Sequence, residues 1–237
     1  MLTLAIDTST KTASIALLDD DVVLSEVLIS LNLHHCATLL PAMESLTIMA
    51  GITPDKVDLL ACTVGPGSFT GLRIGASTVK GLALATGRPV VGVSTLDALA
   101  LNLVPLSMTI CPMLDAGKKD VYTALYRMGQ KDVPEKTEKE MIANVGKFLE
   151  NLDKDEDIIF VGDGAVKHRG LIKEILPERS FFASSHQQFI RAAAVGMLGL
   201  RKFNDGDILN FITFTPLYLR PSEAQAKKVT GEKQEKY

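Results

Sequence analysis

The sequence contains little cysteine, and its three cysteines are far apart. Cys36, Cys62 and Cys111 each stand beside apolar residues. An odd number of widely spaced cysteines favours buried reduced thiols over a disulfide or metal framework, and free cysteine is among the residues most often buried. We therefore expect buried, reduced thiols that bind no metal.

The sequence also lacks a large excess of charge of one sign and a long hydrophobic run. Its formal net charge is -3, which does not indicate a surface for nucleic acid or membranes. The longest apolar stretch, from Leu96 to Leu106, is interrupted by Asp97 and Pro105 and is too short to cross a bilayer. The first residues lack the basic segment and cleavage site of a signal peptide, so we expect a cytoplasmic protein without a membrane segment.

Histidine is scarce, and none of the four has the spacing of a metal-binding pair. His34 and His35 are adjacent and project in different directions, while His168 and His186 are isolated. Ser68 does not lie in a nucleophile-elbow pattern, and no Ser/His/Asp arrangement can be assembled around it. The sequence therefore predicts no metal site and no catalytic residues of its own.

What remains is the composition of an ordinary globular protein, with 46% hydrophobic and 22% charged residues in a chain of 237.

Three short strands at 2–7, 13–18 and 22–29 are separated by polar turns, which predicts a meander. The patterns that follow predict a helix over 36–50, a buried strand over 57–64, a helix over 71–86 and a strand over 89–93.

The pattern starts again after Pro105, which predicts a second lobe similar to the first. Strand 109–115 ends in Asp115, as strand 2–7 ends in Asp7, and each acid precedes a turn into another strand, here over 121–126. A helix over 142–152, a strand over 158–161, a glycine turn with a helix after it, and a helix over 187–203 follow. We assign residues 1–104 to the first lobe, 105–226 to a second, divergent lobe and 227–237 to a mobile tail.

A glycine-rich loop from Val64 to Gly75 joins a predicted strand to a predicted helix, and Ser68 or Thr70 could cap that helix. The loop matches neither the dinucleotide-binding spacing nor the Walker pattern, because Leu72-Arg73 stand where Lys-Ser/Thr would be required. The common nucleotide-binding fingerprints are therefore excluded.

With Ile6–Thr10 before it and Leu217–Ala224 after it, this loop closely resembles the bacterial TsaB (YeaZ) family over nearly the whole chain. The resemblance implies a two-lobed α/β fold like that of actin, sugar kinases and heat-shock ATPases, with duplicated mixed sheets flanked by helices. It also implies a non-catalytic member of the complex that makes threonylcarbamoyladenosine in tRNA.

The superfamily resemblance implies a residual nucleotide cleft, in which an acid of the first hairpin and a glycine turn of each lobe face ATP and a metal. The matching residues of this sequence are Asp7, Thr8, Ser9, Gly65, Gly67, Gly162 and Gly164. The alternative is inherited scaffolding, in which Asp7 only caps its turn and the glycines only permit tight corners. We expect that no cofactor is required and that ATP or ADP binds weakly at most.

Catalytic relatives in the same branch carry a His-x-x-x-His pair on the helix after the strand here written Val90–Val93. The corresponding stretch of this sequence, Ser94 to Ala100, contains no histidine. The metal site of those relatives is therefore missing from the sequence, and with it the basis for a glycoprotease-like hydrolase.

The resemblance further implies that two helices of the first lobe bind the catalytic TsaD-like subunit, or a second copy when the chain is alone. The residues expected at this surface are Leu39, Met43, Leu46, Leu72, Ile74, Val79 and Leu82. The alternative is that these side chains form ordinary core, since apolar helix faces usually pack inward.

We thus expect a scaffold that positions the subunit transferring threonylcarbamoyl to N6 of adenosine thirty-seven in tRNAs reading ANN codons. It should recruit a TsaE-like ATPase and meet tRNA only indirectly. The rival is a small-molecule kinase or ATPase of the same fold acting alone, and a hydrolase that uses Ser68 is the weaker alternative.

Overall fold

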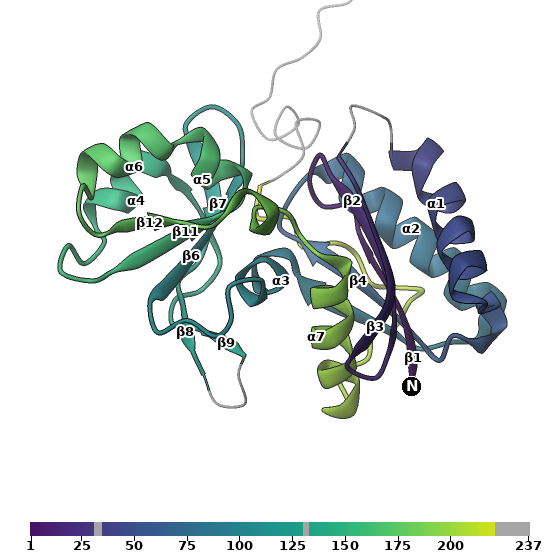
Figure 1. Cartoon of the computed structure of the whole chain (residues 1–237). Helices are drawn as coiled ribbons and strands as arrows, with labels where there is room; N and C mark the ends of the chain where they lie inside the picture. The colour runs from purple at the N-terminus through teal and green to yellow at the C-terminus, as the bar shows by residue number, and fades with distance from the viewer. Residues whose placement is uncertain (31–34, 130–132, 221–237) are drawn as a thin grey trace, which may run out of the picture.

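The computed structural model describes residues 1–30, 35–129 and 133–220 and arranges them in two lobes (Figure 1). The predicted tail over 227–237 and His34 lie outside the described residues, as does the side chain of Cys36. In the described part of the chain, no helix is both long and apolar enough to cross a membrane.

The first lobe is built on a five-stranded sheet with the order β3-β2-β1-β4-β5. A meander supplies three antiparallel strands, and β4 and β5 then add in parallel beside β1. The strands are β1 (Leu2–Asp7), β2 (Ala13–Asp19), β3 (Val22–Ile29), β4 (Leu59–Gly65) and β5 (Val90–Ser94). The predicted meander is confirmed, and the strand expected from residue 57 begins two residues later because Pro54–Lys56 form a 3-10 turn.

The second lobe repeats this order in a sheet whose main path is β10-β7-β6-β11-β12. Its strands are β6 (Thr109–Asp115), β7 (Asp120–Thr123), β10 (Met141–Asn144), β11 (Ile158–Val161) and β12 (Ser180–Phe182), with β8 (Tyr126–Met128) and β9 (Pro134–Lys136) beside β6. In each lobe, a central strand pairs antiparallel with its hairpin partner on one side and parallel with a later strand on the other. The duplicated two-lobed α/β fold is therefore confirmed.

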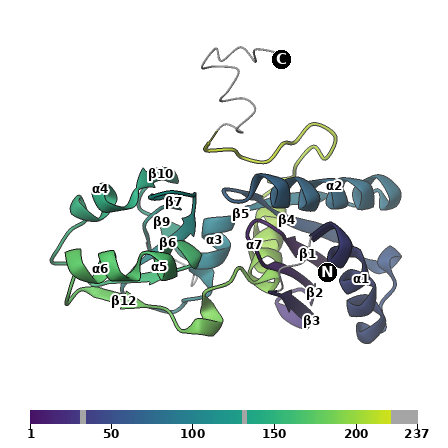
Figure 2. The same cartoon turned by 90° about the horizontal axis from the view of Figure 1, so that it is seen from above.

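Helices cover both faces of the first sheet (Figure 2). On one face lie α1 (His35–Ala50) and α2 (Phe69–Thr86), which pack on Leu4, Ile6 and other large side chains. On the other lie α3 (Thr95–Leu101) and α7 (Ala192–Asn204), against the small side chains of Ala5, Ala16 and Ala61. The second lobe carries α4 (Val145–Glu150), α5 (Asp163–Lys167) and α6 (Arg169–Ile175).

The chain after the second lobe returns to the first, which corrects the expected second lobe over 105–226. A Cβ at Gly196 would collide with Leu18, and one at Gly199 would approach Ala61, so the small residues of α7 let it lie close on the first sheet. Residues 205–220, which we call the C-terminal strap, then run along the first lobe, where Leu209 forms a bridge with Val90. Of the residues expected in the second lobe, those of α7 and of the C-terminal strap therefore lie against the first.

Three predicted elements of the second part are also wrong in detail. Residues 141–144 form edge strand β10 beside β7, and α4 begins only after Asn144, whose side chain caps it. The helix expected from residue 187 starts at Ala192, because Ser185–Gln187 form a separate 3-10 turn with a capping box. The strand expected over 121–126 is split into β7 and β8.

The two lobes share one apolar core and one cluster of polar side chains. Leu96 and Leu99 of α3 pack with Ile110 and Val161 of the second lobe in a single buried cluster. Beside it, Lys136 Nζ lies 2.8 Å from an oxygen of Asp97 and 2.7 Å from one of Glu140. Tyr126 donates to Asp97 at 2.7 Å, and Ser94 donates to Glu140. The lobes are thus joined by packing and by charge.

Candidate functional site

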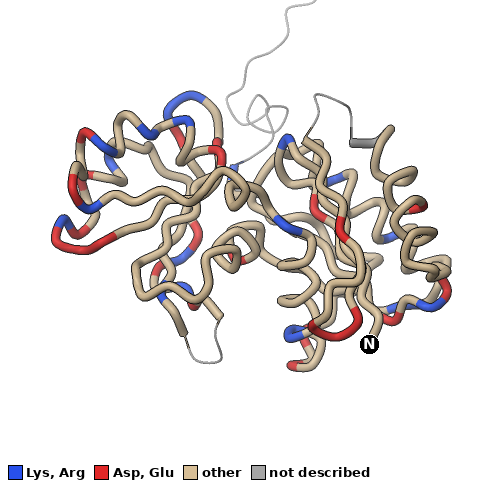
Figure 3. The backbone as a smooth tube through the Cα atoms, in the orientation of Figure 1, with Lys and Arg blue, Asp and Glu red and all other residues tan. Residues whose placement is uncertain are grey.

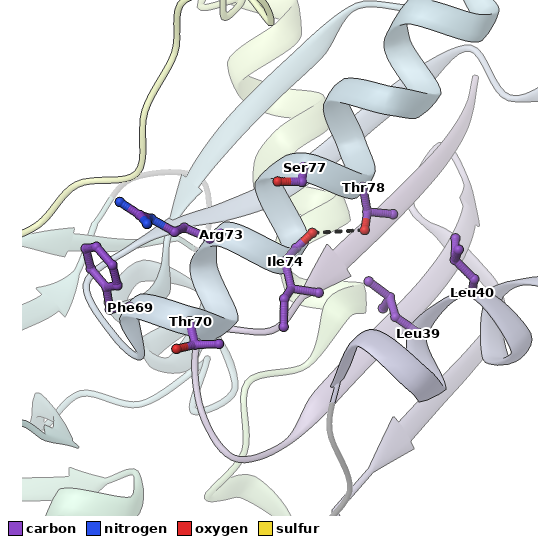
Figure 4. Close-up of a pocket in the computed structure, with 8 residues that line it drawn as sticks. All are labelled: Leu39, Leu40, Phe69, Thr70, Arg73, Ile74, Ser77 and Thr78. Atoms are coloured by element: carbon purple, nitrogen blue, oxygen red, sulfur yellow. Dashed lines mark hydrogen bonds between the residues drawn. The ribbon is translucent and has the colours of Figure 1, made fainter.

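A groove of about 480 Å³ lies between α1 and α2 on the outer side of the first lobe (Figure 4). Both helices contribute side chains to it, and most of the exposed lining is apolar. The lining residues are Leu39, Leu40, Phe69, Thr70, Arg73, Ile74, Ser77 and Thr78. The groove therefore offers an apolar surface between two helices, with one cation, Arg73, at its edge.

Helix α1 is apolar on both its inner and its outer face. Leu39 and Leu46 point into the core, whereas Leu40, Ile48 and Met49 are 55%, 70% and 68% exposed. Glu44 is the only Asp, Glu, Lys or Arg in the helix. Large apolar side chains that stay exposed on a helix are typical of an interaction surface. Figure 3 shows the helix as a nearly uncharged tube.

Helix α2 is fixed on the first sheet by its capped N-terminus and its glycines. Ser68 accepts a hydrogen bond from the Gly71 amide, as predicted for a helix cap. A Cβ at Gly71 would collide with the Thr8 carbonyl oxygen, and Thr8 Oγ1 donates to the Gly71 carbonyl at 2.7 Å. Gly87 ends the helix in the left-handed conformation, also as expected.

The outer face of α2 carries small side chains. The whole helix contains two cations, Arg73 and Lys80, and no acid. Thr70, Ser77 and Gly81 are exposed along it, and Leu84 near its end is 77% exposed. Small residues at helical spacing let the backbone of another helix approach closely. Together with α1, this face is suited to receive helices from a partner.

At the first turn of α2, aromatic and cationic side chains form a stack that ends the groove. The Arg73 guanidinium lies 4.0 Å from the centroid of the Phe69 ring, and the Tyr218 ring packs on Phe69 with 4.7 Å between centroids. Arg73 Nε donates to the Tyr218 hydroxyl at 3.3 Å. Neither Phe69 nor Arg73 was predicted for the interface, and the sequence signal was their place at the first turn of the capped helix.

Four of the seven side chains predicted for the interface are buried, which favours the alternative of ordinary core for them. Leu39, Leu46, Leu72 and Val79 are buried in the first lobe, so their side chains stabilise the core; only Leu39 also reaches the floor of the groove. Met43, Ile74 and Leu82 are half-buried and pack against the same core. The exposed neighbours of these residues, rather than the residues themselves, form most of the outer surface.

Asp7, Thr8 and Ser9, which were predicted for a nucleotide cleft, make internal contacts in the first lobe. Asp7 is fully buried, and its Oδ1 accepts hydrogen bonds from the Ser9 amide, the Ser9 hydroxyl and the Thr63 hydroxyl. Thr8 and Ser9 are buried as well. These contacts favour the scaffolding interpretation, in which Asp7 stabilises its turn.

The glycines predicted for the cleft are also in close contact with backbone. A Cβ at Gly67 would collide with the Ser9 carbonyl, and one at Gly65 would meet the Leu217 carbonyl of the C-terminal strap. Gly162 and Gly164 lie close to the Met113 carbonyl in the second lobe. The two groups of glycines therefore pack within separate parts of the fold, and nucleotide binding stays a prediction.

A cavity of about 370 Å³ between the lobes is lined by neighbours of the predicted residues. Lys11 comes from the hairpin of the first lobe, and Asp115, Asp163 and Lys167 come from the second. Burial opposes ionisation of Asp115, but the hydrogen bonds from Lys167 at 2.7 Å and from the Gly117 amide, together with the Lys167 charge, hold the Asp115 pKa below its usual value. Burial raises the pKa of Asp163. The charges of this cavity are thus largely balanced within the protein.

The thiols and histidines that the structure describes form no metal centre. Burial, and then the charge of Asp7, raises the pKa of the Cys62 thiol to about 12, and burial raises that of Cys111 to about 12. Their predicted burial is confirmed. In the described ranges, no group of at least three His, Cys, Asp or Glu side chains is placed to hold an ion.

The comparisons with known proteins point in one direction. The model of the family described as "TsaD: tRNA N6-adenosine threonylcarbamoyltransferase" matches residues 23–228. The "tRNA threonylcarbamoyladenosine biosynthesis protein TsaB" of Bacillus subtilis is 33% identical over 98% of this chain and 100% of its own length. The protein of that name from Escherichia coli is 29% identical, also over 98% and 100%.

Among solved structures, "YeaZ from Pseudomonas aeruginosa" is similar to this chain with a TM-score of 0.78. It is 28% identical, and the match covers 92% of this chain and 99% of that protein. The likeness therefore extends over both lobes.

Proposed function

The chain belongs to the TsaB (YeaZ) family of tRNA threonylcarbamoyladenosine biosynthesis proteins, and from this premise we propose that it is the non-catalytic, partner-binding subunit of the modifying complex. Its task is to hold a TsaD-like catalytic subunit through the surface of α1 and α2. The catalytic subunit transfers the threonylcarbamoyl group to N6 of adenosine thirty-seven in tRNAs that read ANN codons.

The observation that carries this proposal is the exposed apolar surface around the groove. Four large apolar side chains on two adjacent helices are more than half exposed: Leu40, Ile48, Met49 and Leu84. Single exposed apolar residues are common, but Leu40 lines an apolar groove, and such a groove between helices that carry further exposed apolar side chains is typical of a docking site. A complementary pair of helices would bury the groove.

The occupant that we propose is a chain of the same fold. A TsaD family model matches most of this sequence, so the catalytic subunit should present a corresponding pair of helices. Two such pairs, packed face to face, would form a four-helix arrangement of near-twofold symmetry. A second copy of this chain also presents such a pair of helices, so a homodimer is the expected competing state when the chain is alone.

The chemistry of the complex belongs, in this proposal, to the partner subunits. Asp7 accepts internal hydrogen bonds, and the stretch from Ser94 to Ala100 supplies no histidine, which supports a scaffold rather than an enzyme. We place the metal and the transfer chemistry in the TsaD-like subunit and ATP hydrolysis in a TsaE-like subunit. Contact with tRNA through these partners, in the cytoplasm, completes the proposal.

The test is a titration of the TsaD-like subunit with this chain carrying Leu40→Asp. We expect binding at least about tenfold weaker, because a carboxylate would be buried in an apolar interface. The matched control is Val166→Asp on α5, since Val166 is also 55% exposed but lies in the second lobe. Equal loss in both variants, or no loss with Leu40→Asp, would contradict the proposed surface.

A further inference from the structure

The C-terminal strap runs along the side of α2 that faces away from α1 (Figure 2). Lys80 donates to the Ile212 carbonyl at 3.3 Å, and its ammonium group lies 4.7 Å from the centroid of the Phe214 ring. Further along, the Leu217 amide donates to the carbonyl of Val64, the first residue of the glycine loop, at 2.7 Å. The strap therefore follows α2 back toward its first turn.

At that turn, the strap supplies the third member of the stack that ends the groove. Phe69 and Arg73 line the groove, whereas Tyr218 does not, and it holds both of them. A ring packed on Phe69 and a hydroxyl that accepts from Arg73 restrict the rotamers of both side chains. Tyr218 thus fixes the shape of one end of the groove.

Two residues later, the strap is attached to the second lobe. Arg220 Nη1 donates to the Ala116 carbonyl at 2.6 Å, and Nη2 pairs with Asp120. Ala116 lies in the turn between β6 and β7, and Asp120 is the first residue of β7, whose amide donates to the Gly117 carbonyl. A forked guanidinium held by two neighbouring acceptors defines the position of the strap more closely than a single contact would.

We infer that Tyr218 and Arg220 are positioning residues that preset the Phe69–Arg73 end of the groove for the partner, an inference that rests on the proposed function of the groove. Arg220 anchors the strap on the second lobe. Tyr218, held in place by that anchor, restricts Phe69 and Arg73 in the wall of the groove. A wall ordered before association loses less conformational freedom on binding, so the partner binds more tightly. The second lobe thereby contributes to the interface indirectly, through the side chains of the strap.

The experiment combines hydrogen exchange on the free chain with titration of the TsaD-like subunit. In the free chain, Tyr218→Ala and Arg220→Ala should speed amide exchange at residues 69–74, while exchange in β1 and β4 stays unchanged. In the titration, both variants should bind about tenfold more weakly. Tyr218→Phe, which keeps the ring, should stay within about threefold of wild type. Thr215→Ala is the matched control, because Thr215 is exposed on the same strap.

Unchanged exchange at residues 69–74 in both alanine variants would overturn the inference, as would faster exchange with unchanged affinity. If Tyr218→Ala lowers the melting temperature strongly, the half-exposed Arg220 site supplies the decisive variant. Failure of the wild-type chain to bind the subunit would instead reject the proposed function, and exchange in the free chain would then still report whether the strap orders the wall.

Discussion

At the scale of one residue, Asp7, the acid expected at a residual nucleotide cleft, has internal contacts that stabilise its turn. Its carboxylate is fully buried and accepts hydrogen bonds from two residues of the fold. We predict that Asp7→Ala lowers the free energy of unfolding by about 2–4 kcal/mol, because buried donors lose their acceptor. The melting temperature should fall by about 5–15 °C. Calorimetry measures this, and binding of the TsaD-like subunit at 25 °C should survive.

The two described thiols lead to a second prediction at this scale. Burial raises the pKa of Cys62 and of Cys111 to about 12, so at pH 8 only about one thiol in ten thousand is ionised. Iodoacetamide at pH 8 should therefore leave both unmodified in the folded chain and alkylate both in urea, as read by peptide mass spectrometry. Rapid alkylation without denaturant would contradict their burial.

The raised pKa values of the two thiols also mean that the free energy of unfolding falls at high pH. The folded-state pKa of each thiol lies above its unfolded value of about 8.5. The stability linked to the thiols is therefore complete below about pH 8.5 and is lost as the pH rises toward 12.

At the scale of elements, helix α2 contains glycines with opposite roles. A Cβ at Gly71 would collide with the Thr8 backbone, whereas nothing lies within 4 Å of one at Gly81. Gly71→Ala should destabilise the chain by about 3 kcal/mol or more, since backbone must move. Gly81→Ala should stabilise it by up to about 1 kcal/mol through helix propensity. Thermal unfolding of the pair checks both signs, and equal effects would contradict the packing of α2 on the hairpin.

The elements also show what the sequence can and cannot predict. The Ser68 cap, the ends at Gly51 and Gly87 and the repeat of strand, acid and turn at Asp115 are local signals, and they predicted α2, α1 and strand β6 well. The outer surface of α1 was harder, because Leu39 and Leu40 are adjacent and equally apolar, yet only Leu40 is exposed. Helical periodicity cannot choose between two apolar faces.

The C-terminal strap could not be predicted for a different reason. Tyr218 contacts Phe69 and Arg73 across a long separation in sequence, and no local pattern reports such a contact. The return of α7 to the first sheet depends in the same way on Gly196 fitting against Leu18. These features follow from tertiary packing, which single-sequence patterns do not encode.

At the scale of the whole molecule, the cluster of Asp97, Lys136 and Glu140 ties the lobes together. Burial lowers the pKa of Lys136, but hydrogen bonds to Asp97 and Glu140 outweigh it and hold the pKa above its usual value. We predict that Lys136→Met lowers the free energy of unfolding by about 1–3 kcal/mol, because two half-buried carboxylates lose their partner.

The matched control is Lys202→Met, which removes an exposed pair with Asp207. It should change stability by less than about 0.5 kcal/mol. Urea unfolding of the two variants measures the contrast, and a loss of equal size in both would mean that the cluster does not join the lobes.

The central claim is that the complex depends on this chain for assembly and not for chemistry. Its most direct test is a reconstituted modification assay with the TsaD-like and TsaE-like subunits, scoring threonine incorporation into unmodified tRNA. We predict that incorporation requires this chain, survives Asp7→Ala and is lost with Leu40→Asp. Incorporation that proceeds without the chain, or that Asp7→Ala abolishes while the subunits still bind, would contradict it.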